Sequence, residues 1–434
     1  MSHRRSGWLP GLAWAFLVAA APARAEFPEE FGALLKEARL AEAATLAETR
    51  VAEDPADGQA LFALGAAQFL GAIEGLGQGL YRLGINNGED STLAEALPFL
   101  RVPVPRNPAP EPASYKALRG VLSGLVDDLA EAEATLARVP ADPVKLTVPL
   151  GAIRLDLNGD GEAGEGERLV LILATVSGVP PVDGGFAATF DESDVPWLRG
   201  YAHLLSAIAE IPLAHDWKAA FDHTFHGVFP DADLPSSPLQ REYERLLKEV
   251  LLNPPEGQSF TGFSPERERL QLAAIADAIA FLHLWRWPAT EPERLSVSRR
   301  HLLSMIELSR ESWARIAAET DDDLEWLPGP HQTSLFSRLR LDESVVTEWH
   351  AFLDGFEAVL EGRLLLPHWR FRHDRGLNVM RMFEEPGIPD PVLLIQGSAA
   401  IPYIEAGPIA AGSTMENAFA LVGRGFLAYF VWFN

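Results

Sequence analysis

The sequence contains no cysteine, which excludes disulfide bonds and thiolate metal sites. It is also poor in cations, because 36 Lys and Arg residues stand against 61 Asp and Glu residues, and the formal net charge is −25. This excess of negative charge argues against nucleic acid and anionic lipid as partners, since both repel an acidic surface. The same charge favours cations as ligands.

Several catalytic motifs are also absent. The chain has no G-x-S-x-G, H-E-x-x-H or G-x-x-x-x-G-K-[ST] pattern, so it lacks the signatures of a nucleophile elbow, a zincin and a P-loop. The glycine run at 75–79 lacks the spacing and the preceding strand of a dinucleotide-binding site. The sequence therefore nominates no catalytic residue.

The first 25 residues have the order of a secretory signal peptide. Basic residues at 3–5 precede an apolar stretch from Trp8 to Ala21, and a small-residue motif ends at Ala25. This order predicts cleavage after Ala25 and a periplasmic or secreted protein. The apolar stretch is too short to span a membrane, and no later stretch reaches about 18 apolar residues, so we expect no membrane span in the mature chain.

Most of the remaining sequence has apolar residues at helical spacing, which predicts a mainly α fold: a helical bundle or a solenoid-like multi-helix array. Only near the C-terminus, at 364–371 and 392–395, do apolar runs suggest extended chain and a small β element. A predicted helix at 30–52, a turn at Pro55 and a second helix at 59–70 resemble a fragment of a tetratricopeptide repeat.

The acidic stretch DLNGDGEAGEGE, residues 156–167, carries a metal-ligand pattern. In twelve-residue calcium loops, oxygen ligands come from positions 1, 3, 5, 7 and 12, with a backbone carbonyl at position 7 and glycine at position 6. Glycine stands at position 6 here, and the ligand positions are Asp156, Asn158, Asp160, Glu162 and Glu167. The stretch resembles an EF-hand calcium-binding loop, which implies Ca²⁺ as the ligand. The alternative is an acidic, glycine-rich turn that binds nothing.

Three departures from the paired EF-hand favour a structural clip over a sensor. Position 8, usually a branched apolar residue, is Ala163, and the chain contains no second D-x-[DN]-x-[DN]-G stretch. Pro149 and Gly151 also leave room for only a short entering helix, at 150–155. A sensor needs two full helices whose angle can change when calcium binds.

Three other groups leave alternatives open. On a continuous helix, His215 and His226 share a face with Asp222, but only Asp222, His223 and His226 are close enough for one zinc ion. The alternative without a metal is that these histidines are hydrogen-bonded on a partly buried helix face. The acidic run 321–325 is most simply a solvated loop, with an acid/base pair or a second cation site as alternatives.

Tryptophan is concentrated in the second half of the chain, where its spacing favours core positions for most residues and stacking on sugar rings for the rest. The residues concerned are Trp197, Trp217, Trp285, Trp287, Trp313, Trp326, Trp349, Trp369 and Trp432.

Pro- and Gly-rich passages suggest the domain order. We expect a signal peptide at 1–25, a repeat-like helical region at 26–100, a Pro-rich linker at 101–113, a helix with the calcium loop at 114–180, and a Trp-rich helical domain with a small β element at 181–434. The leading functional hypothesis is an exported calcium-binding protein that acts as a binding or scaffold protein, with another protein or a carbohydrate as the partner. The alternative is a calcium-stabilised enzyme on carbohydrate, built as an α/α toroid.

Overall fold

The computed structural model describes residues 27–86, 104–141, 144–177, 186–252, 265–323, 325–333 and 343–410. The predicted signal peptide and Trp432 lie outside these ranges. Export and cleavage after Ala25 therefore stay predictions.

The mainly α fold is confirmed: the protein is 61% helical, with thirteen α-helices in the described ranges. The helices are α1 (Phe27–Lys36), α2 (Leu40–Glu53), α3 (Gly58–Arg82), α5 (Tyr115–Leu136), α6 (Leu169–Ser177), α7 (Asp194–Ala214), α8 (Lys218–Thr224), α9 (Ser237–Leu252), α10 (Pro265–Leu284), α11 (Glu293–Ile316), α12 (Glu343–Leu360), α13 (Val379–Glu384) and α14 (Pro391–Gln396). Two small antiparallel sheets, β1–β2 and β3–β4–β5, accompany them.

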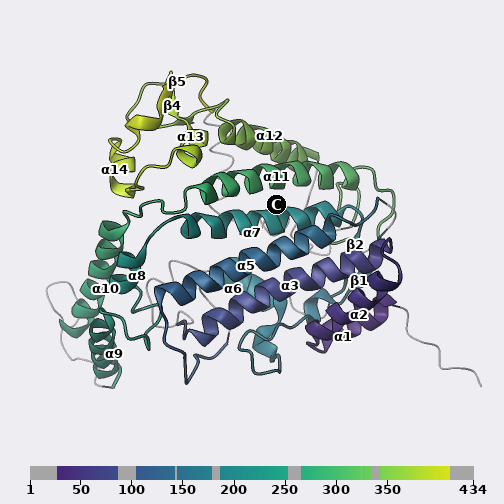
Figure 1. Ribbon diagram of the computed structural model, residues 1–434, viewed down its shortest axis with the longest axis horizontal. Coiled ribbons are helices and arrows are strands. Elements are labelled where there is room, and N and C mark those ends of the chain that lie inside the picture. The colour runs from purple at the N-terminus through teal and green to yellow at the C-terminus, as the bar shows by residue number, and fades with distance from the viewer. Residues whose placement is uncertain are drawn as a thin grey trace, which may run out of the picture.

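Four long helices, α3, α5, α7 and α11, lie side by side in that order and form the central layer (Figure 1). Ion pairs show that α7 and α11 run antiparallel, because Glu210 near the end of α7 pairs with Arg294 at the start of α11. In the same way, Glu133 near the end of α5 pairs with Arg199 near the start of α7. Successive helices of the layer therefore alternate in direction.

One buried hydrophobic cluster extends from Phe27 in α1 to Leu360 in α12, and it crosses each domain boundary expected in this range. The described part of the Pro-rich segment packs on this body: Arg106 pairs with Asp231, and the Asn107 side chain donates to the carbonyl of Tyr81. Apart from α9 and α10, the described helices from α1 to α12 therefore all contribute buried residues to one continuous core.

Helix α3 is continuous over 25 residues, so it extends beyond the helix predicted at 59–70 and includes the glycine run at 75–79. Asp57 caps its start by accepting from the amide of Ala60 at 2.9 Å. By length and composition α3 could cross a membrane, and half of its most apolar stretch is buried inside the protein. A Cβ at Gly65 would lie 2.5 Å from Leu136 Cγ, so glycine allows α5 to approach closely.

The first sheet pairs β1 (Lys145–Val148) with β2 (Ala188–Asp191), and the second joins β3 (Leu366–Pro367), β4 (Arg375–Leu377) and β5 (Ile404–Ala406). The second sheet confirms the β element near the C-terminus. The extended chain predicted at 392–395 is wrong, because these residues lie in α14. Asp390 caps that helix by accepting from the amide of Leu393, and Pro391 follows at the first helical position.

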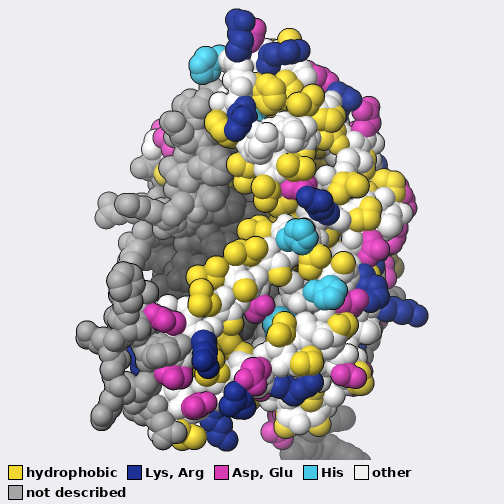
Figure 2. Space-filling view, turned by 90° about the vertical axis from the view of Figure 1, so that its left-hand side faces the viewer, with side chains coloured by type: hydrophobic (Ala, Val, Ile, Leu, Met, Phe, Trp, Pro, Cys, Tyr) yellow, Lys and Arg dark blue, Asp and Glu magenta, His cyan; other side chains and the backbone are white. Residues whose placement is uncertain are grey.

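Helices α9 and α10 expose apolar side chains at one end of the molecule, the end seen in Figure 2. On α10 these are Leu272, Ile275, Ile279 and Leu282, each at least 45% exposed. Exposed apolar patches of this kind are uncommon on soluble proteins, and where they occur they often mark contact sites.

A polar network joins three helices of the central layer. His203 of α7 and His301 of α11 face each other with 2.7 Å between their Nδ1 atoms, so one ring must donate to the other. A hydrogen bond from His203 and the guanidinium of Arg199 hold the pKa of Glu133 at about 2. Burial lowers the pKa of His301 to about 4, and the charges of His203 and Arg300 add to this effect.

We expect stability to fall as the pH drops from about 6.5 to about 4. In this window the unfolded chain binds a proton at His301, whereas the folded protein does not. The contribution of His301 to the free energy of unfolding is therefore fully present above pH 6.5 and is lost as the pH falls toward 4. Urea unfolding at several pH values measures it, and His301→Gln should flatten this part of the profile. An unchanged slope in the variant would contradict the assignment.

Candidate functional site

The acidic loop 156–167 is closed at its base by backbone hydrogen bonds. The amide of Leu155 donates to the carbonyl of Glu167 at 3.1 Å, and the amide of Leu169 donates to that of Ile153 at 2.9 Å. Before the loop, the chain forms a 3-10 turn at Leu150–Ala152 and then becomes extended. The predicted entering helix at 150–155 is therefore wrong, because residues 153–155 pair with the chain that leaves the loop at 167–169. Helix α6 follows the loop.

Inside the loop, the first ligand position organises the backbone. Asp156 Oδ1 accepts from the amides of Gly159 and Asp160 at 2.7 and 3.2 Å, and Oδ2 accepts from the amide of Gly161 at 2.9 Å. Gly159 and Gly161 have φ of 71° and 88°, a left-handed conformation that glycine adopts without strain. Glycine at the sixth position is what the EF-hand pattern requires for its sharp turn.

The next two ligand positions continue this arrangement. Asn158 Oδ1 accepts from the amide of Asp160, and Asp160 Oδ1 accepts from the amide of Glu162, both at 2.8 Å. The Asn158 amide group also donates to Asp160 Oδ2 at 2.9 Å. Three oxygen-bearing side chains at alternate positions are therefore held by hydrogen bonds within one tight loop. Oxygen donors of this kind suit a hard cation such as calcium.

Glu167, the twelfth position, is buried and fixed at the base of the loop. Its Oε1 accepts from the amide of Leu157 at 2.9 Å, and its Oε2 accepts from that of Gly164 at 2.7 Å. Each carboxylate oxygen has a second lone pair for a cation. In the described ranges, the one trio of acidic groups with oxygens all within 4.8 Å of one another lies outside the loop. To bind an ion, Glu167 would therefore have to move toward Asp156 and Asp160.

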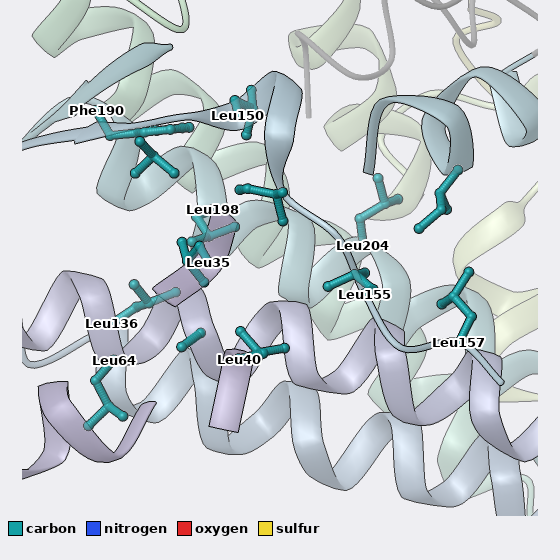
Figure 3. Packing of buried hydrophobic residues seen from close by; sticks show 14 of the residues in the cluster. Leu35, Leu40, Leu64, Leu136, Leu150, Leu155, Leu157, Phe190, Leu198 and Leu204 are labelled. Carbon is teal, nitrogen blue, oxygen red and sulfur yellow. The ribbon is translucent and has the colours of Figure 1, made fainter. Parts of the chain in front are cut away.

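Helix α3 anchors the loop from outside. Glu74 Oε2 accepts from the amide of Asp156, and Gln78 Nε2 donates to the carbonyl of the same residue, both at 2.8 Å. Leu155 and Leu157 point from the chain that enters the loop toward the helices beneath it (Figure 3). Both leucines are at most 2% exposed, so the loop is tied to the core at its first position.

Glu74 is the loop contact that sequence reasoning missed. Burial raises the pKa of its carboxyl, and the nearby carboxylates of Asp156 and Glu167 raise it further. A cation in the loop would relieve this repulsion. Glu74 and Gln78 are one helical turn apart on a largely apolar helix, which was the available signal, but the helix gave no hint of which segment they would meet.

The proposed histidine group is not brought together. Helix α7 ends at Ala214, the chain is extended at His215, and α8 ends at Thr224, so the continuous helix assumed for these residues is wrong. Asp222 pairs with Lys218, His223 is exposed, and His226 is buried with its Nε2 3.3 Å from Asp277 Oδ2. The hydrogen-bonded alternative fits this arrangement better than a zinc site.

Most of the tryptophans that the structure describes serve the core. Trp217, Trp313, Trp326 and Trp349 are at most 7% exposed, Trp197 and Trp287 are partly buried against the core, and Trp369 is 70% exposed. A pocket of about 290 Å³ lies beside the sheet β1–β2, and its lining has carboxylates but no tryptophan. This pocket therefore offers no tryptophan on which a sugar ring could stack, and it does not support the expectation of an enzyme that acts on carbohydrate.

No family model, curated protein or solved structure matches this chain. The fold defines the class of the protein as mainly α-helical, and its function has to be argued from the loop and its surroundings.

The anchoring of the loop predicts the effect of a core substitution. Leu157→Ala should lower the free energy of unfolding by about 2–5 kcal/mol, because it opens a cavity between the loop and α3 at Gly77. The matched control is Leu252→Ala, whose side chain is 68% exposed and whose effect should stay within about 0.5 kcal/mol. Urea unfolding measures both, and equal effects would contradict the anchoring.

Proposed function

We propose that this protein is an exported calcium-binding helical protein in which the loop 156–167 is a structural clip. The observation that carries the proposal is the arrangement of Asp156, Asn158 and Asp160 at alternate positions, each held by amides further along the same loop. Glu167 and the backbone carbonyl of Glu162 would complete the ligands. The order of residues 1–25 supports export.

The surroundings of the loop favour a clip over a switch. A sensor transmits binding by changing the angle between two helices. Here the entering chain is extended and held to α3 by Glu74 and Gln78, so no entering helix is present to rotate. A bound ion would instead hold the extended chain before the loop against α6. Its charge would offset the repulsion between the carboxylates of Glu74, Asp156 and Glu167.

The energetic scale fits a structural role. A site with a dissociation constant near 10 µM in about 1 mM calcium would stabilise the folded protein by about 2.7 kcal/mol. This is a large share of a typical net stability of about 5–15 kcal/mol. A binding or scaffold role is supported by the exposed apolar side chains of α10, which suit contact with another protein.

Calorimetry on the mature protein tests the loop. Titration with CaCl₂ should release or take up heat, and 1 mM calcium should raise the melting temperature. Asp156→Ala and Glu167→Gln should each abolish the contribution of the loop, because each removes a ligand.

Glu162→Gln is the matched control. It removes one negative charge from the same loop but leaves the backbone carbonyl that serves as the ligand, so calcium binding should persist with a modest loss of affinity. The proposal fails if wild type and Asp156→Ala respond identically to calcium, or if Glu162→Gln abolishes binding as completely as Asp156→Ala does.

A further inference from the structure

A second group of carboxylates gathers beside the β1–β2 sheet. Asp191 ends β2, Glu319 follows α11, and Glu325 lies six residues further along the chain. One oxygen from each lies within 4.8 Å of the other two. Glu325 is only 3% exposed, so the group is partly withdrawn from water.

Backbone hydrogen bonds hold the segments of Asp191 and Glu325 together. Thr189 and Glu325 form a parallel bridge, and the amide of Trp326 donates to the carbonyl of Thr189 at 3.2 Å. Asp191 lies two residues beyond Thr189 on the same strand and therefore on the same face. Its Oδ1 accepts from both the amide and the hydroxyl of Ser193 at 2.7 Å, which fixes its orientation. These contacts position Asp191 and Glu325, and Glu319 Oε2 accepts from Gln332 Nε2 at 2.9 Å.

Positive charge does not balance the group. Lys145 lies opposite Asp191 in the β1–β2 register, but its ammonium pairs with Asp323 and with Asp321. Within the described ranges, none of Asp191, Glu319 and Glu325 forms an ion pair with lysine or arginine. Lys145 lines the same pocket, but its ion pairs go to Asp321 and Asp323 and not to these three acids.

A fourth carboxyl is independent evidence for a missing partner. Asp194, the first residue of α7, is 1% exposed, and its Oδ2 accepts from the amide of Asp191 at 3.0 Å. Its Oδ1 is buried and has no hydrogen-bond partner among the described residues, and the same holds for Oε1 of Glu319. A buried carboxylate oxygen without a partner is costly, and a metal ion is one of the few ways to satisfy it.

The electrostatics agree with this picture. Burial raises the pKa of Glu325 to about 7, with further increases from Asp191 and Glu319. Burial, followed by repulsion from Asp191, Glu319 and Glu325, raises the pKa of Asp194 well above its usual range. The four carboxyls are thus mutually coupled and repel one another when ionised.

A pocket adjoins the group. The pocket of about 290 Å³ beside β1 and β2 is lined by Asp191, Glu319 and Glu325, together with Lys145 and Asp321. It has room for water molecules beside the three carboxylates. Calcium takes six to eight oxygens at about 2.3–2.6 Å, so two oxygens on opposite sides of one ion are about 4.6–5.2 Å apart. The spacing of the group, at most 4.8 Å, is compatible with this geometry.

We propose that Asp191, Glu319 and Glu325 form a second calcium site, with the buried carboxyl of Asp194 next to Asp191 and water as the remaining ligands. The site ties the end of β2 to the chain after α11 and to the segment at Glu325. It does not depend on the loop 156–167, so either site can fail without the other.

Calorimetric titration with CaCl₂ counts the sites. Wild type should bind two ions, and Asp156→Ala should bind one. The double variant Asp191→Asn, Glu325→Gln should also bind one ion, at the loop. The matched control is Asp321→Asn, which removes a charge from the same pocket but not from the group, and it should keep both ions.

Folding of the double variant is checked in calcium-free buffer. Its melting temperature should equal or exceed that of wild type, because the substitutions remove repulsion between buried acids. Two ions bound to a folded double variant would overturn the proposal.

Terbium gives a readout that leaves the carboxylates intact. Tb³⁺ replaces Ca²⁺ at oxygen sites and luminesces when a nearby indole absorbs light. In Asp156→Ala, excitation of tryptophan should produce Tb³⁺ luminescence through Trp326, the neighbour of Glu325, and added CaCl₂ should quench it. Trp326→Phe on that background should reduce the signal severalfold. Absence of calcium-competed luminescence in Asp156→Ala would overturn the proposal whatever the fate of the double variant.

Discussion

Helix α3 meets its neighbours at distances that a side chain would forbid. A Cβ at Gly65 would collide with Leu136 of α5, and a Cβ at Gly77 would lie 2.7 Å from Leu157 at the mouth of the acidic loop. This close approach brings Glu74 and Gln78 within hydrogen-bonding distance of Asp156. One surface of α3 therefore contacts both α5 and the acidic loop, and its glycines lie where these contacts are closest.

Negative charge is the second constraint on the molecule. With a formal net charge of −25, the chain repels itself, and some of its acids are buried beside one another. Glu74 faces Asp156 and Glu167 at the loop, and Asp194 adjoins the group at the end of β2. Arginine offsets this charge elsewhere, as in the pair between Glu210 and Arg294. At the two carboxylate groups, calcium would take the same role.

The sequence predicted features that depend on local rules. The α-helical class followed from periodicity, and the acidic loop followed from ligand spacing within twelve residues. Local rules failed where a competing local signal was overlooked: the apolar run 392–395 is helical because Asp390 and Pro391 start a helix. The face shared by His215 and His226 was lost because the chain leaves the helix at Ala214.

Features built from distant segments were beyond sequence reasoning. Asp191, Glu319 and Glu325 meet only because Thr189 pairs with Glu325, a contact over more than a hundred residues. The acidic run 321–325 was noticed as one alternative, but nothing in it identified Asp191 or Asp194 as neighbours. Glu74 was hidden for the same reason, since its partner lies 82 positions along the chain.

The most direct test of the calcium clip is a crystal structure of the mature protein grown in millimolar calcium, with anomalous scattering to locate the ion. The account predicts an anomalous peak inside the loop, surrounded by side-chain oxygens of Asp156, Asn158, Asp160 and Glu167 and by the carbonyl of Glu162. An ordered loop without such a peak, with Glu167 still bonded to the amides of Leu157 and Gly164, would contradict it.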